Sequence, residues 1–209
     1  MAKKIVIVSF FLLSIAVCKA QKVIEKEFSS EEIYKLSIVD DAIFKIEIQS
    51  SENSTIKISA HISGENSESI IIEEKIVDGI LSLKTGFAPF FSLENDKLAA
   101  HKVMAIELKI TVPSTISVEI KSKLASVFVN GTYKNLAVSI ENSNCDLQNF
   151  SGNAHLKTIS GNITVIANNT VLGIAVSKNG IVKNELFKNG KFLVEAESIN
   201  GSISLLQTK

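Results

Sequence analysis

The sequence predicts an all-β protein built as a β-solenoid-like stack of two-strand repeats in a single domain. Three observations predict this fold. Apolar and polar residues alternate with period two over most of the chain, short turns rich in Asn, Gly and Ser recur in its second half, and there are only 2 prolines. Alternating segments bury one face and leave the other in water. An antiparallel β-sandwich whose hairpins happen to recur is the alternative that the sequence leaves open.

The first twenty residues are typical of a secretory signal peptide. Two lysines form a basic start, an apolar stretch follows, and Cys18-Lys19-Ala20 then provides small residues before Gln21. We therefore expect cleavage between Ala20 and Gln21, export to the periplasm or the exterior, and no transmembrane anchor after processing. A lipoprotein anchored through Cys18 is disfavoured, because Val17 rather than a small residue precedes that cysteine.

The charge of the chain argues against nucleic acid as a partner. The precursor has 22 basic and 22 acidic residues. The signal peptide removes three lysines and no acid, so the mature chain has 19 lysines against 22 acids, a net charge of −3, and no arginine. Such a chain lacks the basic surface and the guanidinium groups that nucleic-acid binding favours. Of the two cysteines only Cys145 survives processing, which leaves no intramolecular disulfide.

Residues 21–113 are expected to form the N-terminal strands of the domain. Asp78-Gly79 lies between two apolar runs and predicts a tight hairpin. The expected strands with clear alternation are 43–49, 55–62, 70–76, 80–83 and 106–112.

A loop insertion over residues 85–102 interrupts these strands. It contains Phe87, Phe90 and Phe91, and its second half could form a helical turn or two. Three phenylalanines in a loop indicate either a plug over an open end of the core or an exposed binding patch. We favour the plug, because stacked repeats need a cap, and keep the patch as the alternative.

Residues 114–209 carry an internal repeat of about 19 residues, in which an alternating strand, a small polar turn and a second short strand follow one another. Asn and Gly tolerate the left-handed backbone region that a tight bend needs. The expected structural corners are Asn144, Gly161, Asn162, Gly180 and Gly201. Each turn leads into an apolar position, in order Val127, Leu147, Ile163, Ile181 and Ile203. Because one repeat cannot bury its apolar face alone, the repeats should stack and share one core.

Two segments carry a family resemblance. Val112-Pro113 followed by the strand 116–122, and later the segment 156–163, resemble the bacterial putative-adhesin β-strand-repeat family, also called the toastrack repeat. The resemblance covers about residues 37–209, with Asn162 where the family's usual corner, Ser-Gly-Asp-Ile, has an acid. It implies an exported β-solenoid-like domain and transfers no catalytic residue.

Side chains that could carry chemistry are scattered along the chain. His61, His101 and His155 lack metal-ligand spacing, so we expect no metal and no other cofactor. Cys145 has no base beside it in the sequence, which favours a structural role over a nucleophile. The acids of the repeat region do not cluster. We therefore expect no catalytic residue and no enzyme activity.

These observations predict an exported, non-catalytic envelope or surface protein with a binding, scaffolding or adhesin-like role and an unidentified envelope partner. Two alternatives stay open. A secreted or periplasmic polysaccharide-active enzyme would show an acidic cluster on one face, and an apolar-ligand carrier would show a deep apolar pocket beneath the insertion. Flat polar faces would favour a binding scaffold.

Overall fold

The computed structural model describes residues 21–64, 66–91 and 104–208. The expected signal peptide and residues 92–102 of the expected insertion, which include His101, lie outside these residues. Across the described ranges, no helix has the length and apolar character that crossing a bilayer would require.

Nearly all described elements are strands, which confirms the all-β prediction. Within the described ranges the single helical element is the short 3-10 helix η2 (Ser67–Ser69). The strands are β1 (Gln21–Ser29), β2 (Lys35–Val39), β3 (Lys45–Ser51), β4 (Thr55–Gly64), β5 (Ile70–Val77), β6 (Ile80–Phe87), β7 (Met104–Pro113), β8 (Ser117–Ser122), β9 (Ser126–Ile140), β10 (Cys145–Thr158), β11 (Ile163–Ala167), β12 (Val171–Ser177), β13 (Val182–Asn184), β14 (Phe192–Ser198) and β15 (Ile203–Gln207).

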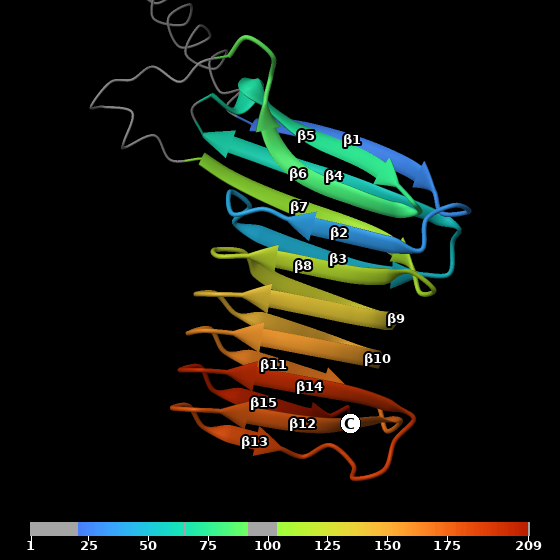
Figure 1. Cartoon of the computed structure of the whole chain (residues 1–209), viewed down its shortest axis with the longest axis vertical. Helices are drawn as coiled ribbons and strands as arrows, with labels where there is room; N and C mark the ends of the chain where they lie inside the picture. The colour runs from blue at the N-terminus through green and yellow to red at the C-terminus, as the bar shows by residue number, and fades with distance from the viewer. Residues whose placement is uncertain (1–20, 65, 92–103, 209) are drawn as a thin grey trace, which may run out of the picture.

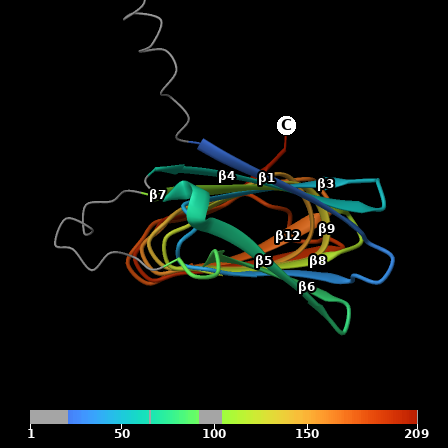
Figure 2. The ribbon, with the colours of Figure 1, turned by 90° about the horizontal axis from the view of Figure 1, so that it is seen from above.

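The strands form two layers that enclose one apolar core. Layer A has the order β1-β4-β7-β3-β9-β10-β11-β15-β13. Layer B has the order β5-β6-β2-β8-β9-β10-β14-β12. The first half of β9 and of β10 lies in layer A and the second half in layer B. Figure 1 shows the strands stacked from β1 and β5 at one end to β13 at the other, and Figure 2 shows the two layers viewed along the stack.

Strand direction divides the stack into two parts. The ladders β1–β4, β4–β7 and β5–β6 are antiparallel and lie at the N-terminal end. The other described ladders, including all of those in the repeat region, are parallel. Parallel pairing follows from the repeat, because units that wind in the same sense place equivalent strands side by side. It excludes the antiparallel sandwich for the repeat region.

β9 and β10 pass from layer A to layer B through sharp bends at one edge of the stack. Gly131 in β9 and Gly152 in β10 have φ angles of 106° and 127°, a region that side-chain-bearing residues rarely adopt. A Cβ at Gly152 would also lie 1.9 Å from the carbonyl oxygen of Tyr133. The left-handed glycines of the repeat region are therefore at this edge.

The opposite edge is a row of corners, which we call the corner row, where the chain returns from layer B to layer A. A Cβ at Gly161 would lie 1.6 Å from the carbonyl oxygen of Ser143, and one at Gly201 would lie 1.9 Å from that of Gly161. A Cβ at Gly180 would lie 2.1 Å from the carbonyl oxygen of Gly201. None of these three glycines has a positive φ. Our expectation that they supply left-handed backbone is therefore wrong; they are needed because successive corners lie in contact.

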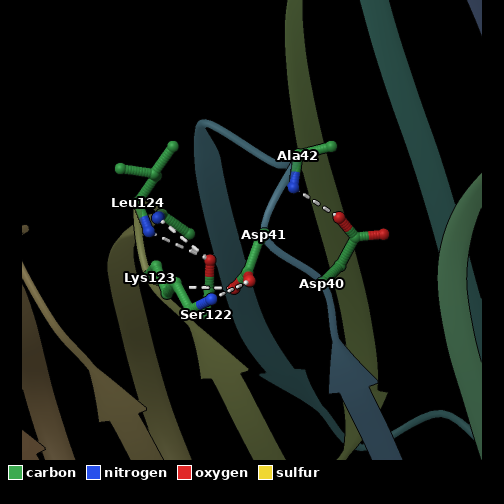
Figure 3. A network of polar contacts seen from close by, with 7 residues as sticks. Asp40, Asp41, Ala42, Ser122, Lys123 and Leu124 are labelled. Atoms are coloured by element: carbon green, nitrogen blue, oxygen red, sulfur yellow. Dashed lines mark hydrogen bonds and ion pairs between the residues drawn. The ribbon is translucent and has the colours of Figure 1, made fainter.

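Side chains also join successive corners. Asn144 Oδ1 accepts a hydrogen bond from the backbone N–H of Asn162 at 2.9 Å, and Asn162 Oδ1 accepts one from Ser202 at 2.8 Å. Nearer the N-terminus a carboxylate takes this role: Asp41 Oδ1 accepts the backbone N–H of Lys123 at 2.9 Å (Figure 3). The corner row is thus tied together along the stack, with an acid at its start and amides further on.

The register corrects two of the apolar positions expected after the corners. Cys145 pairs with Val127 and with Ile163, so Cys145 rather than Leu147 holds the equivalent core position. Likewise Val182 rather than Ile181 pairs with Ile203.

The last repeat of the sequence is not the last in space. β14 lies between β10 and β12 in layer B, and β15 lies between β11 and β13 in layer A. The C-terminal repeat therefore inserts into the stack, and the segment 171–191 forms its far end.

The N-terminal end of the core is closed by two long side chains that cross between the layers. Lys26 on β1 forms an ion pair with Glu74 on β5. Lys22 Nζ donates hydrogen bonds to the carbonyl oxygens of Glu68 and Ile70 at 2.7 and 2.8 Å. Both lysines lie on the strand face shared with Ile24, which packs on the core, so their aliphatic stems cover apolar residues while their ammonium groups reach polar partners.

Candidate ligand-binding groove

A groove of about 760 Å³ runs over the outer face of layer A, across β1, β4, β7, β3, β9 and β10. Its floor consists of outward side chains from six adjacent strands. Cross-strand pairing arranges them in two rows. The first row is Glu25, Ser59, Lys109, Glu47, Phe128 and Asp146. The second row is Glu27, Lys57, Thr111, Gln49, Asn130 and Gln148.

The β1–β3 side of the groove is a set of ion pairs. Glu47 pairs with Lys45 on its own strand and with Lys109 of β7 at 3.8 Å. Glu27 and Lys57 pair at 3.7 Å. The hydrogen bond with Glu47 raises the pKa of Lys45, so this lysine stays charged. These carboxylates are neutralised in pairs and leave this half of the groove without a strong net field.

The β3–β10 side of the groove carries an amide row, which we define as Gln49, Asn130 and Gln148. They are direct neighbours on three adjacent strands, and all three are exposed. Asn149 extends the row, since its Nδ2 donates to Asn130 Oδ1 at 3.2 Å. A side-chain amide offers both a donor and an acceptor, so the row can satisfy ligand groups of either kind.

Phe128 lies beside the amide row and is the one aromatic residue among the described residues that line the groove. Its side chain is 39% exposed, and the Lys45 ammonium lies 5.4 Å from the ring centroid. A partly exposed ring flanked by amides and a cation gives the groove an apolar platform with polar groups around it. This arrangement suits a ligand that is flat and apolar on one face and polar at its edges.

The three phenylalanines named from the sequence lie elsewhere, at the N-terminal end of the stack. Phe87 ends β6 and is 39% exposed, and Phe90 is fully exposed. Phe91 is half-buried and stacks on Phe87, with 5.3 Å between ring centroids. None of the three lines the groove of layer A. Their role as a plug or as a binding patch stays a prediction.

The corner residues named from the sequence lie apart from the groove. Asn144, Gly161, Asn162, Gly180 and Gly201 are gathered in the corner row, where they join successive corners.

Among the described residues, His61, His155 and Cys145 do not come together in a catalytic or metal-binding arrangement. His61 lies on layer A near Ser59, and His155 Nδ1 lies 3.5 Å from the Glu195 carboxylate on layer B. No group of three or more His, Cys, Asp or Glu side chains in the described ranges could hold a metal ion. Cys145 is fully buried, and burial together with the Asp146 charge raises the pKa of its thiol, which keeps it protonated.

The groove residues carry no signal in the sequence that marks them as a set. The alternation identified Gln49 as an outward residue, but every strand of the sheet has such residues. The groove depends on which strands are neighbours. Because β3 lies between β7 and β9, residues more than sixty positions apart in the sequence come side by side, and local patterns carry no signal for this.

The fold is similar to those of solved bacterial proteins, whereas the sequence alone finds no match. No protein-family model matches the chain. No curated protein matches it either. A structure described as a putative cell adhesion protein from Clostridium sporogenes superposes with a TM-score of 0.62 at 18% identity, covering 90% of this chain and 100% of that one. This similarity shows the fold alone.

Two further solved structures match less closely. A putative adhesin from Bacteroides fragilis has a TM-score of 0.38 at 13% identity and covers 88% of this chain and 97% of its own. One from Parabacteroides merdae has a TM-score of 0.38 at 13% identity, with coverages of 90% and 97%. The resemblance to adhesin-like repeat proteins is confirmed at the level of fold by the clostridial structure.

Proposed function

We propose that this chain is an exported, non-catalytic binding protein of the adhesin type that holds a carbohydrate chain in the groove of layer A. The observation that carries the proposal is the amide row of Gln49, Asn130 and Gln148 beside the exposed ring of Phe128. Sugar hydroxyls both donate and accept hydrogen bonds, as amides do, and the C–H face of a sugar ring packs well on an aromatic ring.

The shape of the groove supports a polymer rather than a small apolar molecule. It runs across six strands along an open face, and 12 of its 17 lining residues have polar or charged side chains. An apolar carrier would instead bury its cargo among apolar side chains. The fold similarity to a protein described as a cell adhesion protein supports the adhesin-type role.

The pairing of the groove acids argues against the rival function of polysaccharide cleavage. A glycosidase needs two carboxyl groups that flank one bond, one of them protonated. Glu47 is held between Lys45 and Lys109, and Glu27 pairs with Lys57. Both carboxylates are therefore engaged by lysines of the groove floor and do not form a pair of free carboxyl groups that could flank one glycosidic bond.

Binding to a panel of immobilised bacterial polysaccharides tests the ligand class. We expect the chain from Gln21 to bind at least one of them, and the double variant Asn130→Ala/Gln148→Ala to lose at least about ten-fold in affinity, because two hydrogen-bonding amides are removed. Asn135→Ala/Asn142→Ala is the matched control, since it removes two exposed amides outside the groove. No binding to any polysaccharide, or equal losses in both variants, would refute the proposal.

Export is tested separately by mass. We expect exported protein to begin at Gln21. Recovery of the uncleaved chain from the cytosol would contradict export without bearing on the groove.

A further inference from the structure

The end rung, which we define as residues 171–191, forms the C-terminal end of the described stack, where each strand has a paired edge and an edge without a neighbouring strand. β12 pairs with β14 alone and β13 with β15 alone, within the described residues. The loop after β13 covers part of the β12 edge: Asn184 Nδ2 donates to the carbonyl oxygen of Gly173 at 2.7 Å, and Leu172 forms an isolated bridge with Phe187. The edge from Ile174 onward is open.

Two outward positions of the end rung are apolar where the two preceding rungs are polar. In layer B, Ile174 and Val176 are 52% and 60% exposed. The residues at the same two positions in the two preceding rungs are Glu195 and Glu197 in β14, and His155 and Lys157 in β10.

The corner of the end rung shows the same change. Ile181, which is 77% exposed, directly precedes the first residue of β13, where the two preceding rungs have Ser202 and Asn162. Phe187, in the following loop, is also exposed. The apolar side chains therefore follow the rim of the stack, from Phe187 beside Leu172, along β12, and round the corner. At these three register positions the two preceding rungs have polar residues, and this difference sets the end rung apart from the rungs beside it.

The end rung is also basic on a molecule that is acidic overall. Residues 171–191 contain Lys178, Lys183, Lys188 and Lys191 against Glu185 alone, a net charge of +3. The mature chain as a whole carries −3. Lys183 pairs with Glu185 at 2.9 Å, and the Lys191 ammonium lies 5.2 Å from the ring centroid of Phe192.

We propose that the end rung docks the protein on an anionic phospholipid bilayer. Exposed aliphatic and aromatic side chains with lysines beside them match the boundary between anionic headgroups and acyl chains. The positive charge fits an anionic bilayer better than a second copy of the chain. Two end rungs packed face to face would bring the four lysines of one copy close to the four of the other, and like charges repel. With the end rung on the bilayer the stack projects from the surface, and the groove of layer A, on the side of the stack, stays accessible.

Vesicle flotation of the chain from Gln21 tests the proposal. We expect it to float with vesicles of phosphatidylcholine and phosphatidylglycerol in about equal parts, to float far less with phosphatidylcholine alone, and to be released by high salt. Lys178→Gln/Lys188→Gln should weaken the affinity about five-fold per lysine. Ile174→Ser/Val176→Ser/Ile181→Ser should abolish flotation while the urea midpoint stays close to that of the parent.

Matched controls lie elsewhere on the surface. Val39→Ser/Leu124→Ser removes exposed aliphatic side chains, and Lys57→Gln/Lys84→Gln removes exposed lysines, so both should float as the parent does. Three results would overturn the proposal: no flotation with anionic vesicles, flotation that the triple serine variant retains, or a dimer in sedimentation that this variant dissociates. The polysaccharide test of the groove is independent of all three.

Discussion

The antiparallel N-terminal part and the parallel repeat part of the stack hold their chains together in different ways. In the N-terminal part, long flexible side chains close the gaps, as Lys26 does by reaching Glu74 across the end of the core. A Cβ at Gly86 would meet only the carboxylate end of Glu73. In the repeat part, backbone meets backbone: Gly161 lies directly against Ser143. The first part can adapt to change, whereas the second is fixed by contact.

The two parts also differ in how their corners are tied. Asp41 accepts the backbone N–H of Lys123 where the N-terminal part meets the repeats (Figure 3). That hydrogen bond, followed by the bond and charge of the Lys123 side chain, holds the pKa of Asp41 below its usual value. Further along the corner row, the side-chain amides of Asn144 and Asn162 accept the equivalent backbone hydrogen bonds, and an amide does not titrate. The hydrogen bond between Asp41 and Lys123 should therefore weaken in acid, whereas the hydrogen bonds of Asn144 and Asn162 should not.

The largest expected difference comes from adding one methyl group to each part. Gly161→Ala should destabilise the protein by about 3 kcal/mol, because the new Cβ would overlap a backbone oxygen and the corner must move. Gly86→Ala should change stability by less than about 1 kcal/mol, because a flexible carboxylate can move aside. Urea unfolding of both variants checks this. Equal losses would show that the corners are no more closely fixed than the N-terminal hairpin.

A smaller effect is expected from the hydroxyl groups beneath the corners. Thr158 is buried, and its hydroxyl lies 2.6 Å from the Gly161 carbonyl oxygen and 2.9 Å from Ser198 Oγ. Thr158→Val keeps the shape and removes both bonds, which should cost about 1–3 kcal/mol by leaving a buried acceptor unsatisfied. Thr55→Val, at a half-buried site in β4, is the control and should cost less. A Thr158→Val variant as stable as the parent in urea would show that corner contact alone holds the stack.

The sequence predicted the strands and repeats because both depend on local patterns. Alternation identifies which residues of a strand are buried, and small polar turns recur wherever the chain changes layer. The reason for the corner glycines could not be predicted, since it depends on the carbonyl oxygen of the neighbouring corner. Nor did a local pattern show that β14 and β15 insert before β12 and β13, because every repeat offers a similar parallel edge.

The same reasoning applies to the two proposed binding surfaces. The amide row joins residues of β3, β9 and β10, so predicting it would have required knowledge of the strand order. The sequence predicted Ile181 only as the apolar position after a corner, and it carried no signal that Ile174, Val176 and Ile181 lie exposed at one end of the stack. Only the inserted repeat makes those residues terminal.

A third and smaller effect on stability is expected from an ion-pair cluster where the antiparallel N-terminal part meets the parallel repeat part. Glu119 in β8 pairs with Lys121 of its own strand and with Lys35 of β2, and these lysines lower the pKa of its carboxyl group. A lowered folded-state pKa adds stability above the unfolded value, near 4.5, that is lost as pH falls through the folded value. Glu119→Gln should cost up to about 1 kcal/mol at neutral pH and nothing at about pH 2. Urea unfolding at both values measures this, and a loss that persists in acid would mean that packing rather than charge is involved.

The smallest effects are expected at the aromatic residues of the N-terminal end, where the adaptable part of the stack should tolerate change. Phe90→Ala should alter stability by less than about 0.5 kcal/mol, because the side chain is fully exposed. Phe87→Ala/Phe91→Ala removes a stacked pair whose rings are only partly buried, and should cost about 0.5–1.5 kcal/mol. Phe150→Ala, which truncates a fully buried ring in β10, sets the scale at about 3–5 kcal/mol. Thermal melts of the three variants compare them directly. If the Phe87/Phe91 pair costs as much as Phe150, the phenylalanines plug the core as the sequence suggested, and the N-terminal end is as closely packed as the repeats.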